Sequence, residues 1–338
     1  MYVTAGGPYN SGFRPYYAAF YEERRQIRRT SSSVCFTLFI GVLLMGVILP
    51  KILLACLQAN GYAFTGDNNF SNLQPVMYYL LIGVDYVLGL AIPAFTYFSA
   101  RRIPLSAGVP FQKNGWKTTA VYVAFGSMIC MLANYPANLV AEIQKHFGFS
   151  GTLPEMPLNN DPWVLALYIV NVAVIPPLVE ELLFRGVALQ SLRRFGDGFA
   201  VVVSAILFGV YHGNFIQMAF AFLCGLAMGY AVVRTNSLLP SILIHLINNA
   251  LSVVLEILTR FYGQETAAHV DSILCIVLVA LGIAALLLLF WKKKLFTPRK
   301  RCSILPFSTR MGAAFGNFGA ILFLFYGIAS SVAMMYHG

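Results

Sequence analysis

The sequence predicts an all-α protein, a polytopic transmembrane helical bundle of about eight or nine spans. Only 11% of the 338 residues are charged and 58% are hydrophobic, with a mean hydropathy of +0.71. Soluble domains carry about 25% charged residues, so most of this chain is expected to lie in lipid. Helices and closed barrels satisfy their backbone in lipid, and the apolar runs here are far too long for barrel strands.

Nine apolar runs are candidate spans, because about 20 helical residues cross a bilayer. They cover residues 34–57, 76–98, 118–136, 162–190, 199–214, 215–234, 238–256, 272–291 and 313–335. The fifth and sixth runs are short and adjoin each other, so we expect a tight helix pair or a re-entrant piece there. The first run lacks a clear small-residue cleavage site and is expected to stay as a span.

The basic residues indicate an orientation in the membrane. Lys and Arg gather in the N-terminal tail and in alternate loops, which predicts a cytoplasmic N-terminus and an external C-terminus for nine spans. The net charge of +10 sits at the ends of apolar runs, where anionic lipid headgroups lie, so we expect a lipid bilayer and no nucleic acid as the partner. The chain is therefore expected to be a multi-pass protein, and its tail and loops suit a bacterial plasma membrane.

The runs divide the chain into four parts. Residues 1–33 are expected to be a basic cytoplasmic tail, disordered or lying on the membrane surface, and 34–161 to hold spans 1–3 with their loops. Residues 162–256 form the core with spans 4–7, and 257–338 hold spans 8 and 9.

Span 4 carries three ionisable side chains, Glu180, Glu181 and Arg185. Such groups cost free energy in a membrane and need a structural or chemical reason. Glu181 and Arg185 are four residues apart and share a helix face, so we expect a buried ion pair. Glu180 is rotated by about 100° from Glu181 and is free for chemistry. Asp85 in span 2 has no such explanation.

Spans 5 and 7 add Phe208, His212, His245 and Asn249. At 1.5 Å per residue from the presumed cytoplasmic helix ends, Glu180 and His212 each lie about 20 Å deep, Asn249 about 18 Å and His245 about 12 Å. A single buried histidine is more often a packing residue than a catalyst. The agreement in depth of four polar side chains on three helices instead favours one shared site.

These residues resemble the signature of the CAAX protease and bacteriocin-processing (CPBP, or Abi) family of intramembrane glutamic endopeptidases. Its pattern is Glu-Glu-x-x-x-Arg, Phe-x-x-x-His and His-x-x-x-Asn on successive helices. The matching positions are Glu180, Glu181 and Arg185, then Phe208 and His212, then His245 and Asn249. The resemblance covers roughly residues 162–256. It implies an intramembrane endopeptidase acting on a peptide or membrane-anchored protein, lipidated or not.

The chemistry of the site residues supports a hydrolase that needs no cofactor. Glu180 suits a general base for water, with His212 holding that water and passing a proton to the leaving amine. His245 and Asn249 would donate hydrogen bonds to the carbonyl oxygen, with Glu181, Arg185 and Phe208 in support.

Two other classes of function stay open. Glu180, His212 and His245 could instead bind Zn²⁺ with a water in the fourth position, although no His-Glu-x-x-His helix is present. A non-enzymatic transporter, or a protein giving immunity to a peptide toxin, would use the same polar residues differently.

Overall fold

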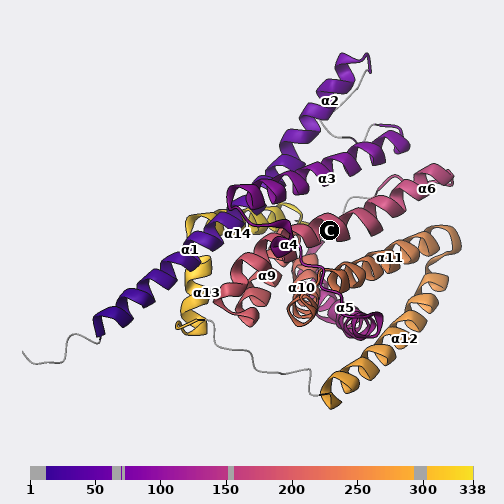
Figure 1. Cartoon of the computed structure of the whole chain (residues 1–338). Helices are drawn as coiled ribbons and strands as arrows, with labels where there is room; N and C mark the ends of the chain where they lie inside the picture. The colour runs from indigo at the N-terminus through magenta and orange to yellow at the C-terminus, as the bar shows by residue number, and fades with distance from the viewer. Residues whose placement is uncertain (1–12, 63–69, 71–72, 151–155, 293–302, 338) are drawn as a thin grey trace, which may run out of the picture.

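The computed structural model describes residues 13–62, 70, 73–150, 156–292 and 303–337, and confirms an all-α membrane bundle (Figure 1). Within that part of the chain, seven helices are long and apolar enough to cross a membrane, or eight if one bent pair counts as a span. The segments in chain order are α1 (Phe13–Leu43), η1 (Leu44–Ile48), α2 (Leu49–Ala59), α3 (Pro75–Ala100), α4 (Leu105–Gly108), α5 (Trp116–His146), β1 (Phe149–Ser150), α6 (Pro162–Ile169), η3 (Val170–Val174), α7 (Ile175–Glu181), η4 (Leu182–Leu189), α8 (Gln190–Leu192), η5 (Arg193–Phe195), α9 (Asp197–Tyr211), α10 (Phe215–Thr235), α11 (Leu239–Tyr262), α12 (Gln264–Trp291), α13 (Phe307–Phe315), α14 (Phe318–Ala333) and β2 (Tyr336–His337).

The expectation of disorder over 1–33 is wrong for residues 13–33, which belong to α1, whereas a position on the membrane surface stays a prediction. Glu22 pairs with Arg25 one turn away and accepts a hydrogen bond from Gln26, which supports the helix outside lipid. Ile27 is fully buried, so tertiary packing also holds this end of the helix. Residues 1–12 lie outside the described part of the chain.

Two of the nine expected spans are not full straight helices. The fifth, expected at 199–214, is the 15-residue α9, which at 1.5 Å per residue reaches only about 22 Å of the ~30 Å hydrocarbon layer. The ninth, expected at 313–335, is the pair α13 and α14, bent by 75°. Asn317 starts α14 at that bend by accepting a hydrogen bond from the backbone N–H of Ala320.

The short α9 lies in the interior because α10 packs closely against it. A Cβ on Gly225 would meet Ala205 at 3.0 Å, and one on Gly209 would meet the Met218 carbonyl oxygen at 2.8 Å. Glycine at these positions lets the two backbones approach. Between the helices, Gly213 adopts φ +57° and turns the chain back toward α10. Together α9 and α10 form a tight hairpin whose turn lies beside His212.

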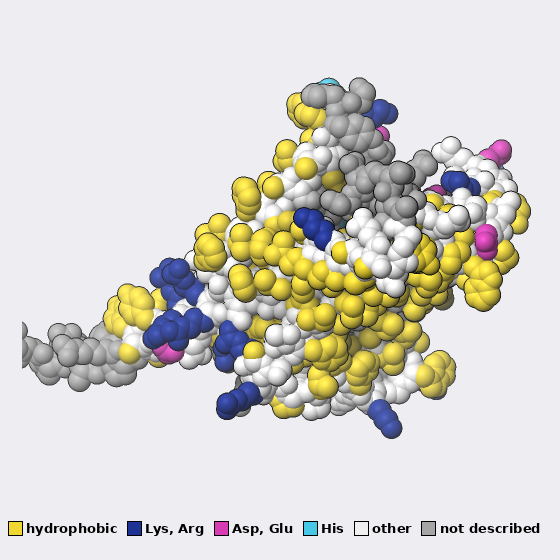
Figure 2. Space-filling model, turned by 90° about the horizontal axis from the view of Figure 1, so that it is seen from above, with side chains coloured by type: hydrophobic (Ala, Val, Ile, Leu, Met, Phe, Trp, Pro, Cys, Tyr) yellow, Lys and Arg dark blue, Asp and Glu magenta, His cyan; other side chains and the backbone are white. Residues whose placement is uncertain are grey.

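Helix ends and basic residues come together at one end of the bundle. Arg194 donates to Thr30 in α1 at 2.8 Å, Arg193 donates to Asn236 at 2.7 Å, and Arg310 donates to the Phe195 carbonyl at 2.5 Å. On the face in Figure 2, most Lys and Arg side chains lie toward the end from which α1 projects, beside a broad hydrophobic surface. Beyond the end of α5, the two-residue strand β1 pairs antiparallel with β2, which follows α14.

Candidate active site

Two prolines interrupt the hydrogen bonding of span 4 just before its carboxylates. Pro176 and Pro177 lack the backbone N–H that would reach the Val172 carbonyl from four or five residues further along. The helix widens here into the π-helical turn η3, and a second π-helical segment, η4, follows Glu181. The Val172 carbonyl oxygen is therefore left without a donor from its own helix.

Glu181 and Arg185 form the expected buried ion pair, with Arg185 Nη1 2.6 Å from Glu181 Oε1 and both side chains 0% exposed. The Arg185 guanidinium also stacks over the Phe208 ring at 4.4 Å and reaches the Gly225 carbonyl at 3.4 Å. The charge of Arg185 thus meets a carboxylate, an aromatic face and a carbonyl. This arrangement ties span 4 to the α9–α10 hairpin.

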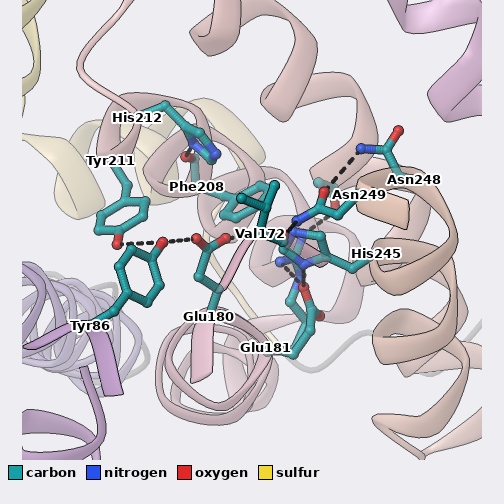
Figure 3. A network of polar contacts seen from close by, with 12 residues as sticks. Tyr86, Val172, Glu180, Glu181, Phe208, Tyr211, His212, His245, Asn248 and Asn249 are labelled. Carbon is teal, nitrogen blue, oxygen red and sulfur yellow. Dashed lines mark hydrogen bonds and ion pairs between the residues drawn. The ribbon is translucent and has the colours of Figure 1, made fainter. Parts of the chain in front are cut away.

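Glu180 points away from that pair, as its position on the helix predicts. Its Oε1 accepts a hydrogen bond from the hydroxyl of Tyr86 in α3, and Tyr86 accepts one from Tyr211 at 3.1 Å (Figure 3). Its Oε2 has no hydrogen-bond partner among the described residues and lies 3.7 Å from His245 Nε2. One oxygen is held in place, and the other faces an imidazole across a gap slightly too long for a hydrogen bond.

The two histidines lie on either side of the Phe208 ring, which meets each of them edge to face. Ring centroids are 4.9 Å apart for Phe208 and His212, and 5.7 Å for Phe208 and His245. His212 Nδ1 lies 2.8 Å from the Phe208 carbonyl, and His245 Nδ1 lies 3.1 Å from Glu181 Oε1. Since a carbonyl or carboxylate oxygen accepts, both Nδ1 atoms carry the proton and both Nε2 atoms remain for chemistry.

Asn249 is fixed by the free carbonyl of span 4. Its Nδ2 donates to the Val172 oxygen at 3.0 Å, and its Oδ1 accepts from Asn248 Nδ2 at 3.2 Å (Figure 3). The double proline of span 4 therefore positions an amide on α11. One hydrogen of that amide is used by Val172, and the second is available to a ligand.

A small cavity of about 40 Å³ lies beside the two histidines, with His212, His245, Asn248 and Asn249 in its wall but not Glu180. This is enough room for at least one water molecule. As to a metal, no group of three or more His, Cys, Asp or Glu side chains in the described ranges is arranged to hold an ion.

The structure brings together all seven residues expected from the sequence, and it adds others that the sequence did not indicate. Tyr86 donates a hydrogen bond to Glu180, and Tyr211 donates one to Tyr86, although the two tyrosines are 125 residues apart in the sequence. The Val172 carbonyl was foreseeable only from the two prolines that follow it. Asp85 is buried, and its Oδ1 has no hydrogen-bond partner among the described residues.

The comparison with known proteins points to the same segment. Residues 162–251 match the family described as type II CAAX prenyl endopeptidase Rce1-like. This segment is therefore similar to CAAX prenyl endopeptidases. The match begins with span 4 and ends two residues after Asn249, so it contains the carboxylates, both histidines and the asparagine. Tyr86 and the helices α3, α5 and α12 lie outside it.

Two bacterial relatives show the same likeness. The chain is 30% identical over 101 residues to the membrane-embedded CAAX protease MroQ of Staphylococcus aureus, covering 28% of this chain and 41% of the relative. It is 24% identical over 110 residues to the putative membrane peptidase YdiL of Bacillus subtilis, covering 32% and 45%. The matches thus span less than half the length of these relatives. No solved structure matches the chain.

Proposed function

We propose that this protein is an intramembrane endopeptidase in which Glu180 activates a water molecule for attack on a peptide carbonyl. One observation carries the proposal: Glu180 Oε2, unpartnered among the described residues, faces His245 Nε2 at 3.7 Å. A gap of that length between two polar atoms suits a bridging water. The family of residues 162–251 supports the same activity.

The proposed reaction starts with transfer of a water proton to Glu180 Oε2 while the hydroxide oxygen bonds to the carbonyl carbon. Tyr86 keeps the other carboxylate oxygen occupied, so the free oxygen is the one that accepts the proton. The oxyanion would accept a hydrogen bond from the second amide hydrogen of Asn249. His245 Nε2 can add a second donor when both of its ring nitrogens carry protons.

Collapse of the tetrahedral intermediate breaks the C–N bond, and the leaving amine takes a proton. We propose His212 as the relay: its Nε2 takes the proton from Glu180 and passes it to the amine, while its Nδ1 stays fixed on the Phe208 carbonyl. The products are a carboxylate and an amine, and no covalent enzyme intermediate is formed. We propose that the reaction uses no metal, since the Glu and His side chains are not arranged as a ligand set.

We further propose that the substrate is a peptide or a membrane-anchored protein, and that the basic end of the bundle faces the cytoplasm of a bacterial cell. The likeness to the CAAX protease MroQ supports a CAAX-type tail as the first candidate. A farnesylated peptide and its unmodified twin would show whether a lipid is required.

The test is cleavage of a peptide library by the purified full-length protein in nanodiscs. Glu180→Gln keeps the acceptor for Tyr86 but removes the base, so cleavage should fall by at least about 10²-fold. Glu256→Gln, at an exposed acid of α11, is the matched control and should keep full activity. A Glu180→Gln protein that cleaves normally would refute the proposal. Stoichiometric zinc that is lost together with activity in chelator would overturn the metal-free scheme.

A further inference from the structure

A second cavity, of about 340 Å³, lies between α5, α11 and α12 and is lined by polar side chains from all three helices. We call it the asparagine cleft, after Asn134 and Asn138 of α5 and Asn248 of α11; its other polar residues include Ser252 of α11 and Asp271 of α12. Its volume is within the ~300–1,000 Å³ of ligand pockets. Because polar side chains in membrane spans face water or a ligand and not lipid, the cleft is expected to be functional.

The asparagine cleft adjoins the candidate active site. Asn248 and Phe220 belong both to its wall and to the wall of the 40 Å³ cavity that contains His212 and His245. Asn248 also donates a hydrogen bond to Asn249, so the two cavities share a hydrogen-bonded residue (Figure 3). A molecule in the cleft would therefore end at the side chains that we assign to catalysis.

The lining chemistry matches an extended polypeptide. Each asparagine offers both donors and acceptors, which is what a peptide backbone requires. Asp271 is the one carboxylate of the lining, which contains no Lys, Arg or His; it is exposed, and no ion pair joins it to another described residue. An unpaired carboxylate at the side of a peptide site favours a basic side chain in the peptide.

The helix register fixes how far from the cleaved bond that basic residue would lie. α11 and α12 meet at Gly263, from which Asp271 is eight residues along one helix and His245 eighteen along the other. At 1.5 Å per residue these depths are about 12 Å and 27 Å, a difference of about 15 Å. An extended strand covers that distance in four or five residues, at about 3.3 Å each.

We propose that the asparagine cleft binds an extended segment of the substrate polypeptide, and that Asp271 selects a Lys or Arg four or five residues from the cleaved bond. This inference rests on the proposed peptidase function. It names residues of α5 and α12, which lie outside the segment that matches the protease family. The tests below separate failure of the cleft from failure of the peptidase.

The first test needs no catalysis, because Cys275 lines the cleft and is a partly exposed free thiol. In the full chain with Cys56→Ser and Cys302→Ser, a cationic methanethiosulfonate should modify Cys275 at least about fivefold faster than an anionic one of equal size. Asp271→Asn should abolish this ratio, while Glu265→Gln, in the first turn of the same helix, should leave it unchanged. No reaction with either water-soluble reagent, or a ratio insensitive to Asp271→Asn, overturns the proposal.

The second test uses peptides that carry Lys or Glu at each position up to six residues on both sides of the cleaved bond. Lys at the fourth or fifth position on one side should raise kcat/KM at least about fivefold over Glu, and Asp271→Lys should reverse that preference. Cleavage with a charge preference that Asp271→Lys does not alter refutes the cleft and leaves the peptidase standing. Protection of Cys275 by the Lys peptide without any cleavage supports the cleft and refutes the peptidase.

Discussion

Removing the arginine of the buried ion pair should destabilise the protein much more than neutralising both partners. In Arg185→Met, Glu181 would stay buried without its counter-charge, and the contact of the guanidinium with the Phe208 ring would be lost. In Glu181→Gln/Arg185→Met neither position of the former pair leaves a charge buried. The glutamine oxygen can still accept the hydrogen bond from His245, so that contact is common to both variants.

The expected cost follows from the complete burial of the pair, with both side chains 0% exposed. Breaking such a pair by removing one partner costs about 3–5 kcal/mol, whereas replacing the pair with neutral groups is often close to neutral. At about 2 °C per kcal/mol for a long chain, Arg185→Met should lower the midpoint of thermal unfolding by about 6–10 °C. The double variant should recover most of this loss.

The assay is thermal unfolding of purified full-length protein in one detergent, followed by circular dichroism and by the fluorescence of a thiol probe. The wild type and the Glu181→Gln single variant complete the double-mutant cycle. Equal losses in Arg185→Met and in the double variant would refute the electrostatic reasoning. In that case Arg185 would stabilise the fold through its packing on Phe208 alone.

Three changes around Glu180 and Asn249, the proposed catalytic carboxylate and amide, should alter kcat/KM without unfolding the bundle, as thermal midpoints near the wild type would verify. Tyr86→Phe removes the hydroxyl that donates to Glu180. Loss of a hydrogen bond to a charged group costs about 1.5–3 kcal/mol, which predicts a fall in kcat/KM of roughly 10- to 150-fold. An unchanged kcat/KM would mean that Tyr86 does not orient the base. Asn249→Asp sets a carboxylate against the Val172 carbonyl, and we expect a loss of at least about fivefold, contradicted by wild-type kinetics. Pro177→Ala supplies an N–H that can compete for the same carbonyl, so a smaller loss of about two- to tenfold is expected; a loss exceeding that of Asn249→Asp would point to a wider distortion of span 4.

The sequence alone indicated the helical class and the residues of the site, because each depends on local pattern. Intramembrane ionisable groups are costly, so Glu180, Glu181 and Arg185 stand out in an apolar run, and the four-residue spacing gives the ion pair directly. The length of a helix also follows from the local sequence pattern. The apolar run at 199–214 nevertheless forms a short interior helix and not a full span. Its apolar residues face protein and not lipid, and hydropathy does not distinguish the two environments.

Contacts between distant spans could not be predicted in the same way. Tyr86 is one of 18 tyrosines, and only the packing of α3 against α7 brings its hydroxyl to Glu180. The asparagine cleft likewise depends on how α5, α11 and α12 lie together, since Asn138 and Asp271 are far apart in sequence. Tertiary packing decides which of these side chains come together. The spacing of apolar residues along one helix does not show which other helix it packs against.

The hydrogen bond from Asn249 to the Val172 carbonyl has a practical consequence for mutagenesis of this protein. The acceptor is a main-chain atom, exposed by the absence of two amide hydrogens, so alanine replacement of Val172 would leave it in place. A conventional side-chain scan of span 4 would score that position as unimportant. Its contribution would emerge only from changing the neighbouring imino acids, or from replacing a backbone amide by an ester.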